Sequence, residues 1–339
     1  MSRHKAVVVG AGGISNAWFP PLQKEKVEIA GVVDIRDEAA KSQCAKYGID
    51  CETGTDLAAM LKAKRPDFIV DLTIPSAHCK VSCDAMRAGC HVIGEKPLAD
   101  TVAEARKMIK VSEETGLMCM VSQSRRYEPR HVALRNAIAR GRLGDITTLN
   151  CDFFMACHFG GFREEMASPL ILDMAIHQFD LARMFIGADP VAVYAHEFNP
   201  KGSWYKGDVS ADCIFEMSDG SVFCYRGSWC AEGMRTSWHG DWRVIGTKGT
   251  VIYEHDQPLK GELATDAGSK GLMRGQKPFE IPDVKMPVKC QHGALREFLR
   301  ALDGGPAPQG LVQDNIHSLE MVCGAIESSR KRRRVEIRR

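Results

Sequence analysis

No stretch of the sequence is apolar for long enough to span a membrane, and the chain has almost no net charge. Its 339 residues carry a formal net charge of +2, with 44% hydrophobic and 26% charged residues. These proportions are typical of a soluble globular protein and indicate neither a nucleic-acid nor a membrane partner. Residues 1–5 lead directly into an apolar segment, so we expect no secretory signal and a cytoplasmic location. The basic run at 331–334 follows a helical pattern and is interpreted as a solvated tail.

The sequence also lacks any C-x-x-C pair, although it contains thirteen cysteines. Without a secretory signal, these are interpreted as reduced thiols and not as a disulfide framework. One cluster of potential zinc ligands lacks the paired spacing of a zinc site and overlaps a predicted helix and strand; it comprises His78, Cys79, Cys83, Cys90 and His91. We therefore expect no bound metal.

The chain is longer than one typical domain, so we expect two. The first begins with a continuous apolar run at 6–9, typical of a strand buried on both faces. Gly10 and Gly12 follow at once, where glycines permit a tight turn and a close approach to a pyrophosphate. The third position of the G-x-G-x-x-G pattern is Ser15, so the fingerprint is imperfect. Pro20 and Pro21 are expected to break or bend the first helix.

A second apolar run at 29–33 ends at Asp34. An acidic residue about 20 positions beyond the glycines is expected to bond the adenosine ribose hydroxyls. Its charge would repel a 2′-phosphate and so favours NAD over NADP. Arg36 instead favours NADP, because a nearby arginine can accommodate that phosphate. NAD is the preferred cofactor, with NADP as the alternative.

Strand and helix patterns continue to alternate up to residue 121. Helices are expected at 37–47, 56–64, 78–88 and 101–115, and strands at 68–73 and 117–121, with a further strand that ends at Ile93 before Gly94. Thr101 and Glu104 form a capping box at the start of the last helix. Repeated β-α units behind a glycine-rich turn predict an α/β Rossmann domain, a doubly wound parallel sheet, over residues 1–123.

From residue 124 to 339 the pattern changes to an α+β domain. Strands at 213–217 and 222–226 flank a turn, and strands at 242–245 and 250–253 flank another, which predicts hairpins in a large open, mostly antiparallel sheet. Three tryptophans lie on this sheet and fit either an exposed interface or packing against the domain's own helices: Trp229, Trp238 and Trp242.

Glu95-Lys96-Pro97 comes directly after a predicted strand. Ligands of parallel α/β sheets bind outside the carboxyl ends of the strands, so a lysine there faces the ligand crevice. Proline restrains the backbone at the preceding residue. The alternative is a solvated Glu-Lys pair in a turn. The glycine turn upstream favours the functional interpretation.

Residues 170–181 are predicted to form one helix on which Asp173, His177 and Asp180 share a face. Most residues between them are apolar, and burying carboxylates and an imidazole is costly unless they are paired or functional. A lone histidine would fit a structural role. Three titratable groups in one stripe favour catalysis.

Together these residues resemble the glucose–fructose oxidoreductase/inositol dehydrogenase/rhizopine catabolism (Gfo/Idh/MocA) family over nearly the whole chain. The glycine turn, the Thr73-x-Pro75-x-x-His78 loop, Glu95-Lys96-Pro97 and Asp173-x-x-x-His177-x-x-Asp180 match the family's motifs. The family's glycines before the last motif are replaced by Ser168–Ile171. The resemblance implies NAD(P)-dependent oxidation of a sugar or polyol hydroxyl, or reduction of the ketone.

The resemblance also implies a homodimer or homotetramer assembled through the open sheet, and a last helix, around 314–330, that packs back on the first domain. Arg163 stands where relatives place a residue of the substrate pocket. The expected cofactor-binding residues are Gly10, Gly12, Gly13, Ile14, Asp34, Ile35, Arg36, Thr73, Ile74, Pro75, His78, Glu95 and Lys96.

We assign His177 as the general base, because histidine has a suitable pKa for a hydroxyl proton at neutral pH. Lys96 would stabilise the developing alkoxide, and Asp173 would bond another substrate hydroxyl or pair with Lys96. The substrate residues are thus Lys96, Arg163, Asp173 and His177, with Asp180 structural. The alternatives are an NAD-dependent glycosidase of the same fold and a non-catalytic dinucleotide-binding regulator.

Overall fold

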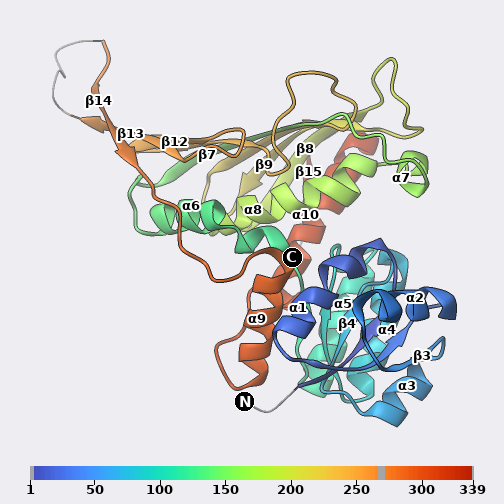
Figure 1. Ribbon diagram of the computed structural model, residues 1–339. Coiled ribbons are helices and arrows are strands. Elements are labelled where there is room, and N and C mark those ends of the chain that lie inside the picture. Colours follow the sequence, from blue (N-terminus) through green and yellow to red (C-terminus); the bar gives the residue numbers. More distant parts are fainter. Residues whose placement is uncertain (1–3, 266–271, 338–339) are drawn as a thin grey trace. The chain divides into compact units, whose positions relative to one another are not determined.

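The computed structural model describes residues 4–265 and 272–337 (Figure 1). The chain forms two compact units that do not correspond to one cut in the sequence. The first unit runs to Tyr127 and includes Pro287–Leu319. The second comprises Glu128–Met286 and the chain from Glu320 onward. Helix α10 (Val312–Lys331) therefore begins in one unit and ends in the other.

The first unit is built on a parallel six-stranded sheet with the order β3-β2-β1-β4-β5-β6. The change of direction at β1 and β4 is that of a doubly wound fold, as predicted. The two central strands are apolar and buried along almost their whole length, which explains their continuous hydrophobic runs. The strands are β1 (Lys5–Val9), β2 (Glu28–Val33), β3 (Glu52–Gly54), β4 (Phe68–Asp71), β5 (His91–Gly94) and β6 (Cys119–Val121).

Local signals explain where most helices of this sheet begin and end. Thr101 accepts a hydrogen bond from the Glu104 amide, and Gly116 closes the same helix in the left-handed conformation. The first helix is interrupted at Trp18, and the two prolines lie in the first turn after the interruption, where missing N–H groups cost nothing. The helices are η1 (Gly13–Ala17), α1 (Phe19–Lys24), α2 (Asp37–Tyr47), α3 (Leu57–Lys64), α4 (Pro75–Arg87), α5 (Val102–Thr115) and η2 (Ser124–Tyr127).

Helix α9 (Cys290–Leu302) belongs to the first unit although it lies far along the chain. Phe298 packs edge-on against Phe68 of β4, with ring centroids 5.2 Å apart. Glu25 at the end of α1 accepts hydrogen bonds from His292 and Arg296 at 2.6 and 2.5 Å. Burial alone would raise the pKa of the Glu25 carboxyl, but the hydrogen bonds and charges of these two residues lower it below its ordinary value. Helix α9 is thereby tied to α1.

The second unit contains a nine-stranded sheet with the order β14-β13-β12-β11-β7-β10-β9-β8-β15, mostly antiparallel with one parallel pair, β7–β10. Both predicted hairpins are present, β9–β10 and β11–β12. The strands are β7 (Ile146–Phe154), β8 (Pro190–Phe198), β9 (Ser210–Met217), β10 (Val222–Ser228), β11 (Asp241–Gly246), β12 (Gly249–Tyr253), β13 (Lys260–Thr265), β14 (Gly275–Glu280) and β15 (Val335–Glu336).

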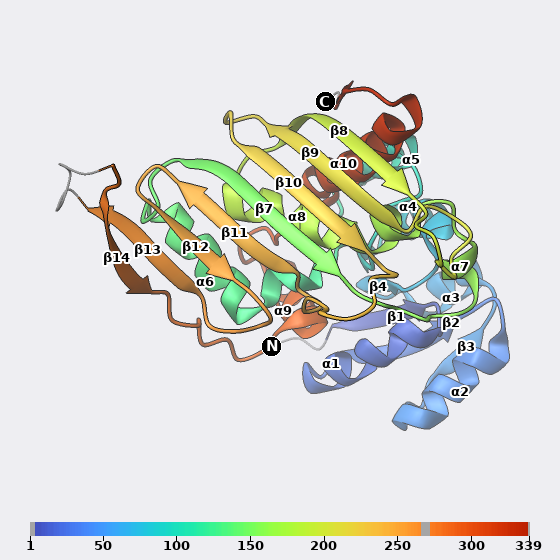
Figure 2. The same ribbon diagram turned by 90° about the horizontal axis from the view of Figure 1, so that it is seen from above.

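Helices α6 (Pro129–Ala139) and α8 (Ile176–Ile186) lie behind this sheet in Figure 2, and its other face is open. Side chains alternate along the strands between the helix-covered core and the open face, as in β8. Trp229 and Trp242 are each 1% exposed and belong to the core, so the interface interpretation is wrong for both. Trp238 is 46% exposed. Which face a strand residue occupies depends on sheet register, which the sequence did not reveal here.

All thirteen cysteines lie in the described parts of the chain and are free thiols. Burial raises the pKa of several of them; that of Cys90, for example, is raised to about 11. Within residues 4–265 and 272–337, no group of three or more histidine, cysteine or acidic side chains is arranged to hold a metal ion. In the same residues, no helix has the length and apolar character needed to cross a membrane.

Candidate active site

The glycine turn after β1 has the geometry that a close ligand approach requires. Gly10 has φ +97°, and a Cβ there would lie 2.7 Å from the carbonyl of Leu72, so no larger residue fits without displacement. Its N–H donates to the Val33 carbonyl at 2.7 Å and fixes the turn to β2. A Cβ on Gly12 or Gly13 would meet nothing within 4 Å. The turn therefore leaves open space where a pyrophosphate is expected.

Asp34 lies at the end of β2 with its carboxylate held by backbone donors. One oxygen accepts from the Ala11 amide at 2.7 Å, and the other accepts from the Arg36 amide at 2.9 Å. The Asp34 side chain is 10% exposed, whereas that of Arg36 is 72% exposed, and its Nε lies 4.0 Å from the carboxylate. The acidic group is thus fixed beside the glycine turn, and the arginine is a solvated side chain at the rim.

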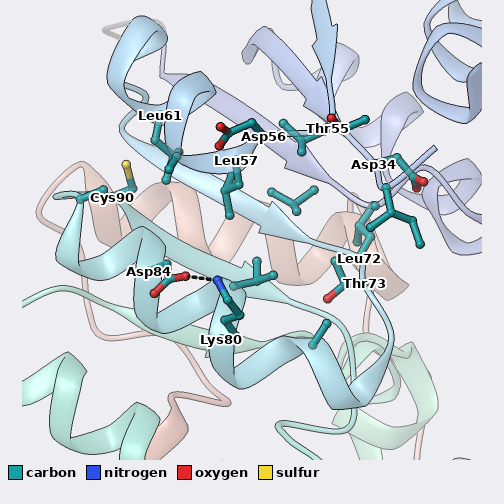
Figure 3. Close-up of a pocket in the computed structure, with 18 of the residues that line it drawn as sticks. Asp34, Thr55, Asp56, Leu57, Leu61, Leu72, Thr73, Lys80, Asp84 and Cys90 are labelled. Carbon is teal, nitrogen blue, oxygen red and sulfur yellow. Dashed lines mark hydrogen bonds and ion pairs between the residues drawn. The ribbon is translucent and has the colours of Figure 1, made fainter. Parts of the chain in front are cut away.

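These residues surround one cavity of about 1230 Å³ in the first unit (Figure 3). Of the residues expected to bind the cofactor, the cavity brings together Gly10, Gly12, Asp34, Ile35, Arg36, Thr73 and Ile74. It is not lined by Gly13, Ile14, Pro75, His78, Glu95 or Lys96. The cavity wall is largely apolar with polar groups at its edges, which fits the adenosine half of a dinucleotide.

Part of the wall was not anticipated from the sequence. Thr55, Asp56 and Leu57 lead into α3, and Lys80 and Asp84 on α4 form an ion pair of 2.7 Å at the opposite side. The strand that places the first three, β3, has only three residues, too few to show a periodicity. It lies beside β2 and runs parallel to it, so its carboxyl end reaches the same edge of the sheet.

His78 lies beneath the loop that follows β4, not on its surface. It is 2% exposed, and its ring nitrogens lie 2.8 Å from the Pro97 carbonyl oxygen and 2.9 Å from that of Thr73. The Thr73 hydroxyl donates to Asp71 at 2.6 Å. His78 therefore connects the loop after β4 to the segment after β5.

Lys96 is half-buried and lies two residues after the end of β5, and its peptide bond to Pro97 is cis. The Glu95 amide donates to the Asp71 carbonyl at 3.0 Å, and the Ser122 amide donates to the Gly94 carbonyl at 2.7 Å. The sheet's own hydrogen bonding thus continues up to the residue before Lys96. This places the lysine at the carboxyl edge of the sheet, as its motif predicts.

In the second unit, the stretch expected to be one α-helix is a π-helix, η3 (Leu170–Ala175), followed by α8. Asp173 lies in the π-helix and His177 in the first turn of α8, so the predicted regular α-helical register is wrong at this point. A π-helix has a wider turn than an α-helix and often occurs at functional sites. Asp173 and His177 are half-buried, and Asp180 is 1% exposed.

Arg163 lies in α7 (Phe162–Glu165) and is bound to the motif, with its Nε 2.6 Å from Asp173 Oδ2. Its guanidinium also covers two phenyl rings, at 5.2 Å from the centroid of Phe159 and 4.8 Å from that of Phe162. Both rings are exposed. Arg163 is therefore an ion-pair partner that orients Asp173, with aromatic surface beside it.

A buried carboxyl supports the segment that enters η3. Glu197 on β8 is 7% exposed; its Oε2 accepts from the Ser168 hydroxyl at 3.3 Å, and no hydrogen-bond partner for its Oε1 is found among the described residues. Burial raises the pKa of Glu197 to about 7, with the charge of Asp208 acting in the same direction. Sequence reasoning missed Glu197. The alternation along β8 is consistent with an inward-facing side chain, but it does not reveal the contact with Ser168.

The raised pKa of Glu197 predicts a pH-dependent stability. The folded state binds a proton more tightly than the unfolded state, so the free energy of unfolding should fall as pH rises from about 4.5 to about 7 and then level off. The difference is about 3 kcal/mol at most. Urea unfolding at pH 5 and pH 8 should show this fall in the wild type and a smaller one in Glu197→Gln. Glu262→Gln, at an exposed position, should behave as wild type. An equal fall in the free energy of unfolding between pH 5 and pH 8 in all three proteins would show that Glu197 is not the group responsible.

Sequence comparisons agree with this architecture. Residues 4–123 match the profile of the oxidoreductase family with an NAD-binding Rossmann fold, and residues 131–252 match that of the GFO/IDH/MocA C-terminal domain. The chain belongs to the GFO/IDH/MocA oxidoreductase family. The resemblance inferred from the motifs is confirmed, and the protein is an NAD-binding oxidoreductase of the dehydrogenase and reductase class.

Similar proteins cover nearly the whole chain. A 4-carboxy-2-hydroxymuconate-6-semialdehyde dehydrogenase from Sphingobium sp. is 36% identical over 91% of this chain and 93% of its own. An inositol 2-dehydrogenase from Rhizobium meliloti is 26% identical over 97% of this chain and 98% of its own. The crystal structure of an oxidoreductase from Agrobacterium radiobacter with NAD⁺, L-tartaric acid and magnesium has the same fold, with a TM-score of 0.86 at 19% identity over 99% of both chains.

Proposed function

We propose that this family member oxidises a secondary hydroxyl of a sugar or polyol with NAD, or reduces the corresponding ketone. The observation that carries the proposal is the fixed Asp34 carboxylate beside an open glycine turn, in the unit that also presents Lys96. Similarity to an inositol 2-dehydrogenase over nearly the full chain supports the substrate class. The glycosidase and regulator alternatives lack comparable support.

A second substrate class has support from one comparison. The relative at 36% identity is named for a semialdehyde that carries a carboxyl group. An aldehyde can be oxidised through its hydrate or hemiacetal, whose carbon bears a hydroxyl and a hydrogen like that of an alcohol. The same proton-accepting and oxyanion-binding groups therefore serve both substrates.

In the proposed mechanism, His177 accepts the proton of the substrate hydroxyl. Lys96 donates a hydrogen bond to the same oxygen and stabilises the negative charge that develops on it. Asp173, held by Arg163, orients a second polar group of the substrate. Bound NAD supplies the nicotinamide that takes up or releases hydride. These roles rest on the family motifs, and the open glycine turn and the cavity fit the dinucleotide.

The test is an absorbance assay of reduced nicotinamide with purified protein, NAD or NADP, and a panel of inositols, aldoses, keto-sugars and carboxylated aldehydes. Turnover of a polyol or sugar supports the first class, and turnover confined to the carboxylated aldehydes supports the second. Binding of NAD with release of nitrophenol from a nitrophenyl glycoside would move the assignment to the glycosidase. A protein that binds neither cofactor would contradict the proposal.

Asp34→Asn is expected to lower the preference for NAD over NADP at least about tenfold in kcat/KM. The amide keeps one oxygen acceptor but removes the charge that repels a 2′-phosphate and binds the ribose hydroxyls. Asp84→Asn is the control, because it lines the same cavity while paired with Lys80. An unchanged cofactor ratio in Asp34→Asn would show that Asp34 does not set the preference.

We further propose that the second unit binds the substrate and forms a homodimer or homotetramer through the open sheet face. Val191, Tyr194, Ile214 and Phe198 are exposed apolar side chains on two neighbouring strands, β8 and β9. A patch of this kind is typical of an interaction site. Sedimentation equilibrium tests the assembly: a monomer at micromolar concentration would contradict it.

The reduced thiols support a cytoplasmic location.

A further inference from the structure

The carboxylate of Glu95, immediately before Lys96, is buried among hydrogen-bond donors. The residue is 7% exposed. Its Oε1 accepts from the Trp18 indole Nε1 at 2.9 Å and from the Gln291 amide at 3.4 Å, and its Oε2 accepts from the Lys96 backbone amide at 3.3 Å. A buried carboxylate with three donors is a satisfied structural charge, whereas one without them would be costly.

The two side-chain donors come from elements far from Glu95 in the sequence. Trp18 is fully buried at the junction of η1 and α1, where η1 is the short helix that follows the glycine turn. Gln291 lies in the first turn of α9. Since Glu25 ties α1 to α9 through His292 and Arg296, both donors belong to one connected frame. Glu95 therefore links the strand that presents Lys96 to the helix that follows the glycine turn.

The segment is also held on the other side of Lys96. The carbonyl of Pro97 lies 2.8 Å from His78 Nδ1, and His78 Nε2 lies 2.9 Å from the carbonyl of Thr73. The backbone is thus bound to buried side chains both before and after the lysine. A catalytic group must stay within a fraction of an ångström of its productive position, and buried supporting contacts provide that restraint.

Glu95 was expected to contact the cofactor, but its surroundings favour another role. It does not line the cavity that holds Gly10, Asp34 and Thr73, and both of its oxygens already accept hydrogen bonds. We propose that Glu95, held by the Trp18 indole, is a positioning residue that fixes Lys96 relative to the glycine turn. This inference rests on the catalytic role proposed for Lys96.

The test compares Trp18→Phe and Glu95→Gln with wild type in the intact enzyme, using the substrate found in the panel assay. Trp18→Phe removes the indole donor and keeps an aromatic ring in the core. Glu95→Gln keeps an oxygen acceptor for Trp18 but replaces Oε2, which accepts from the Lys96 amide, with an uncharged NH₂ group. The matched control is Trp242→Phe, because Trp242 is 1% exposed and its Nε1 donates to the His239 carbonyl at 2.8 Å in the second unit.

We expect Trp18→Phe to lower kcat about tenfold to a hundredfold, as for the loss of a hydrogen bond to a charged group, with the Kd for NAD changed less than about threefold. Trp242→Phe should keep wild-type kcat even if its Tm falls. The kcat of Glu95→Gln should be lowered less than that of Glu95→Leu, because leucine has no oxygen that could accept the hydrogen bond from Trp18. A rise in the Kd for NAD that accounts for the whole effect would assign Glu95 to cofactor binding and overturn the inference. Wild-type kcat in Trp18→Phe would also overturn it.

A double-mutant cycle separates positioning of Lys96 from a general structural effect. In the Lys96→Ala background, assayed at high enzyme concentration, Trp18→Phe should lower kcat less than about twofold, because the group that Trp18 acts through is gone. An undiminished effect in that background would contradict the inference. If the wild-type enzyme itself turns over no substrate, the proposed function fails first, which is a different result from normal turnover with unaffected variants.

Discussion

Lys96→Ala is expected to lower kcat by about a hundredfold to a thousandfold, as does the loss of one oxyanion-stabilising donor in other enzymes. The lysine follows β5 at the carboxyl edge of the parallel sheet, and its neighbours on both sides are bound to buried side chains. Removal of its ammonium group should destabilise the developing alkoxide without altering the adenosine end of the site. The Kd for NAD, measured by tryptophan fluorescence quenching, should therefore change little.

The control for this variant is Lys80→Ala. Lys80 lines the cofactor cavity on an exposed turn of α4 and pairs with Asp84, so its loss removes the same positive charge at a different place. We expect kcat in Lys80→Ala to stay within about threefold of wild type, the range for an exposed ion pair. Wild-type kcat in Lys96→Ala, or an equal loss in both variants, would contradict the assignment of Lys96.

His177→Ala is expected to lower kcat by about a hundredfold to ten-thousandfold, the usual contribution of a general base. His177 lies in the first turn of α8, next to the π-helix that carries Asp173. The decline in rate at low pH that a histidine base produces should disappear in the variant, because no imidazole remains to be protonated. Stopped-flow or steady-state rates from pH 5 to pH 9 test both statements.

His255→Ala serves as the control for His177→Ala. His255 is exposed in the same unit, and its Nδ1 lies 3.6 Å from Asp241. Its replacement should leave both kcat and the pH profile unchanged. If His177→Ala retains wild-type turnover, or loses turnover while keeping the low-pH decline, another group is the base.

Much of the first unit follows from residues close together in the sequence. The apolar run at 6–9 predicts a doubly buried strand, and β1 is one. The capping box at Thr101 predicts the start of α5, and the expected range of 101–115 ends at the last residue of that helix. Such features are visible without a structure because a cap, a turn or a strand's burial pattern depends on residues within a few positions of one another. The glycine turn and Asp34 at the end of β2 are predictable for the same reason.

The family motifs also predict that Lys96 follows a strand and that Asp173 and His177 lie in a helical stretch. They do not predict which side chains surround these three residues. The register of an apolar helix predicted a regular stripe, and a π-helix replaces it at Asp173. A hydrophobic stripe records which residues are buried on average, and it tolerates one additional residue in a turn. The backbone accommodates that residue through the i→i+5 hydrogen bonding of the π-helix, which a hydrophobic pattern does not reveal.

By itself, the sequence determined the alternating sheet, the glycine turn, the acidic residue beside it and the identity of the candidate catalytic groups. Only the tertiary structure decided what the buried polar side chains do. The sequence separates Glu95 from Trp18 by 77 positions and from Gln291 by 196, and it separates Asp34 from Ala11 by 23. A buried carboxylate must find donors wherever the fold brings them, because leaving it unpaired costs more than any local preference can offset.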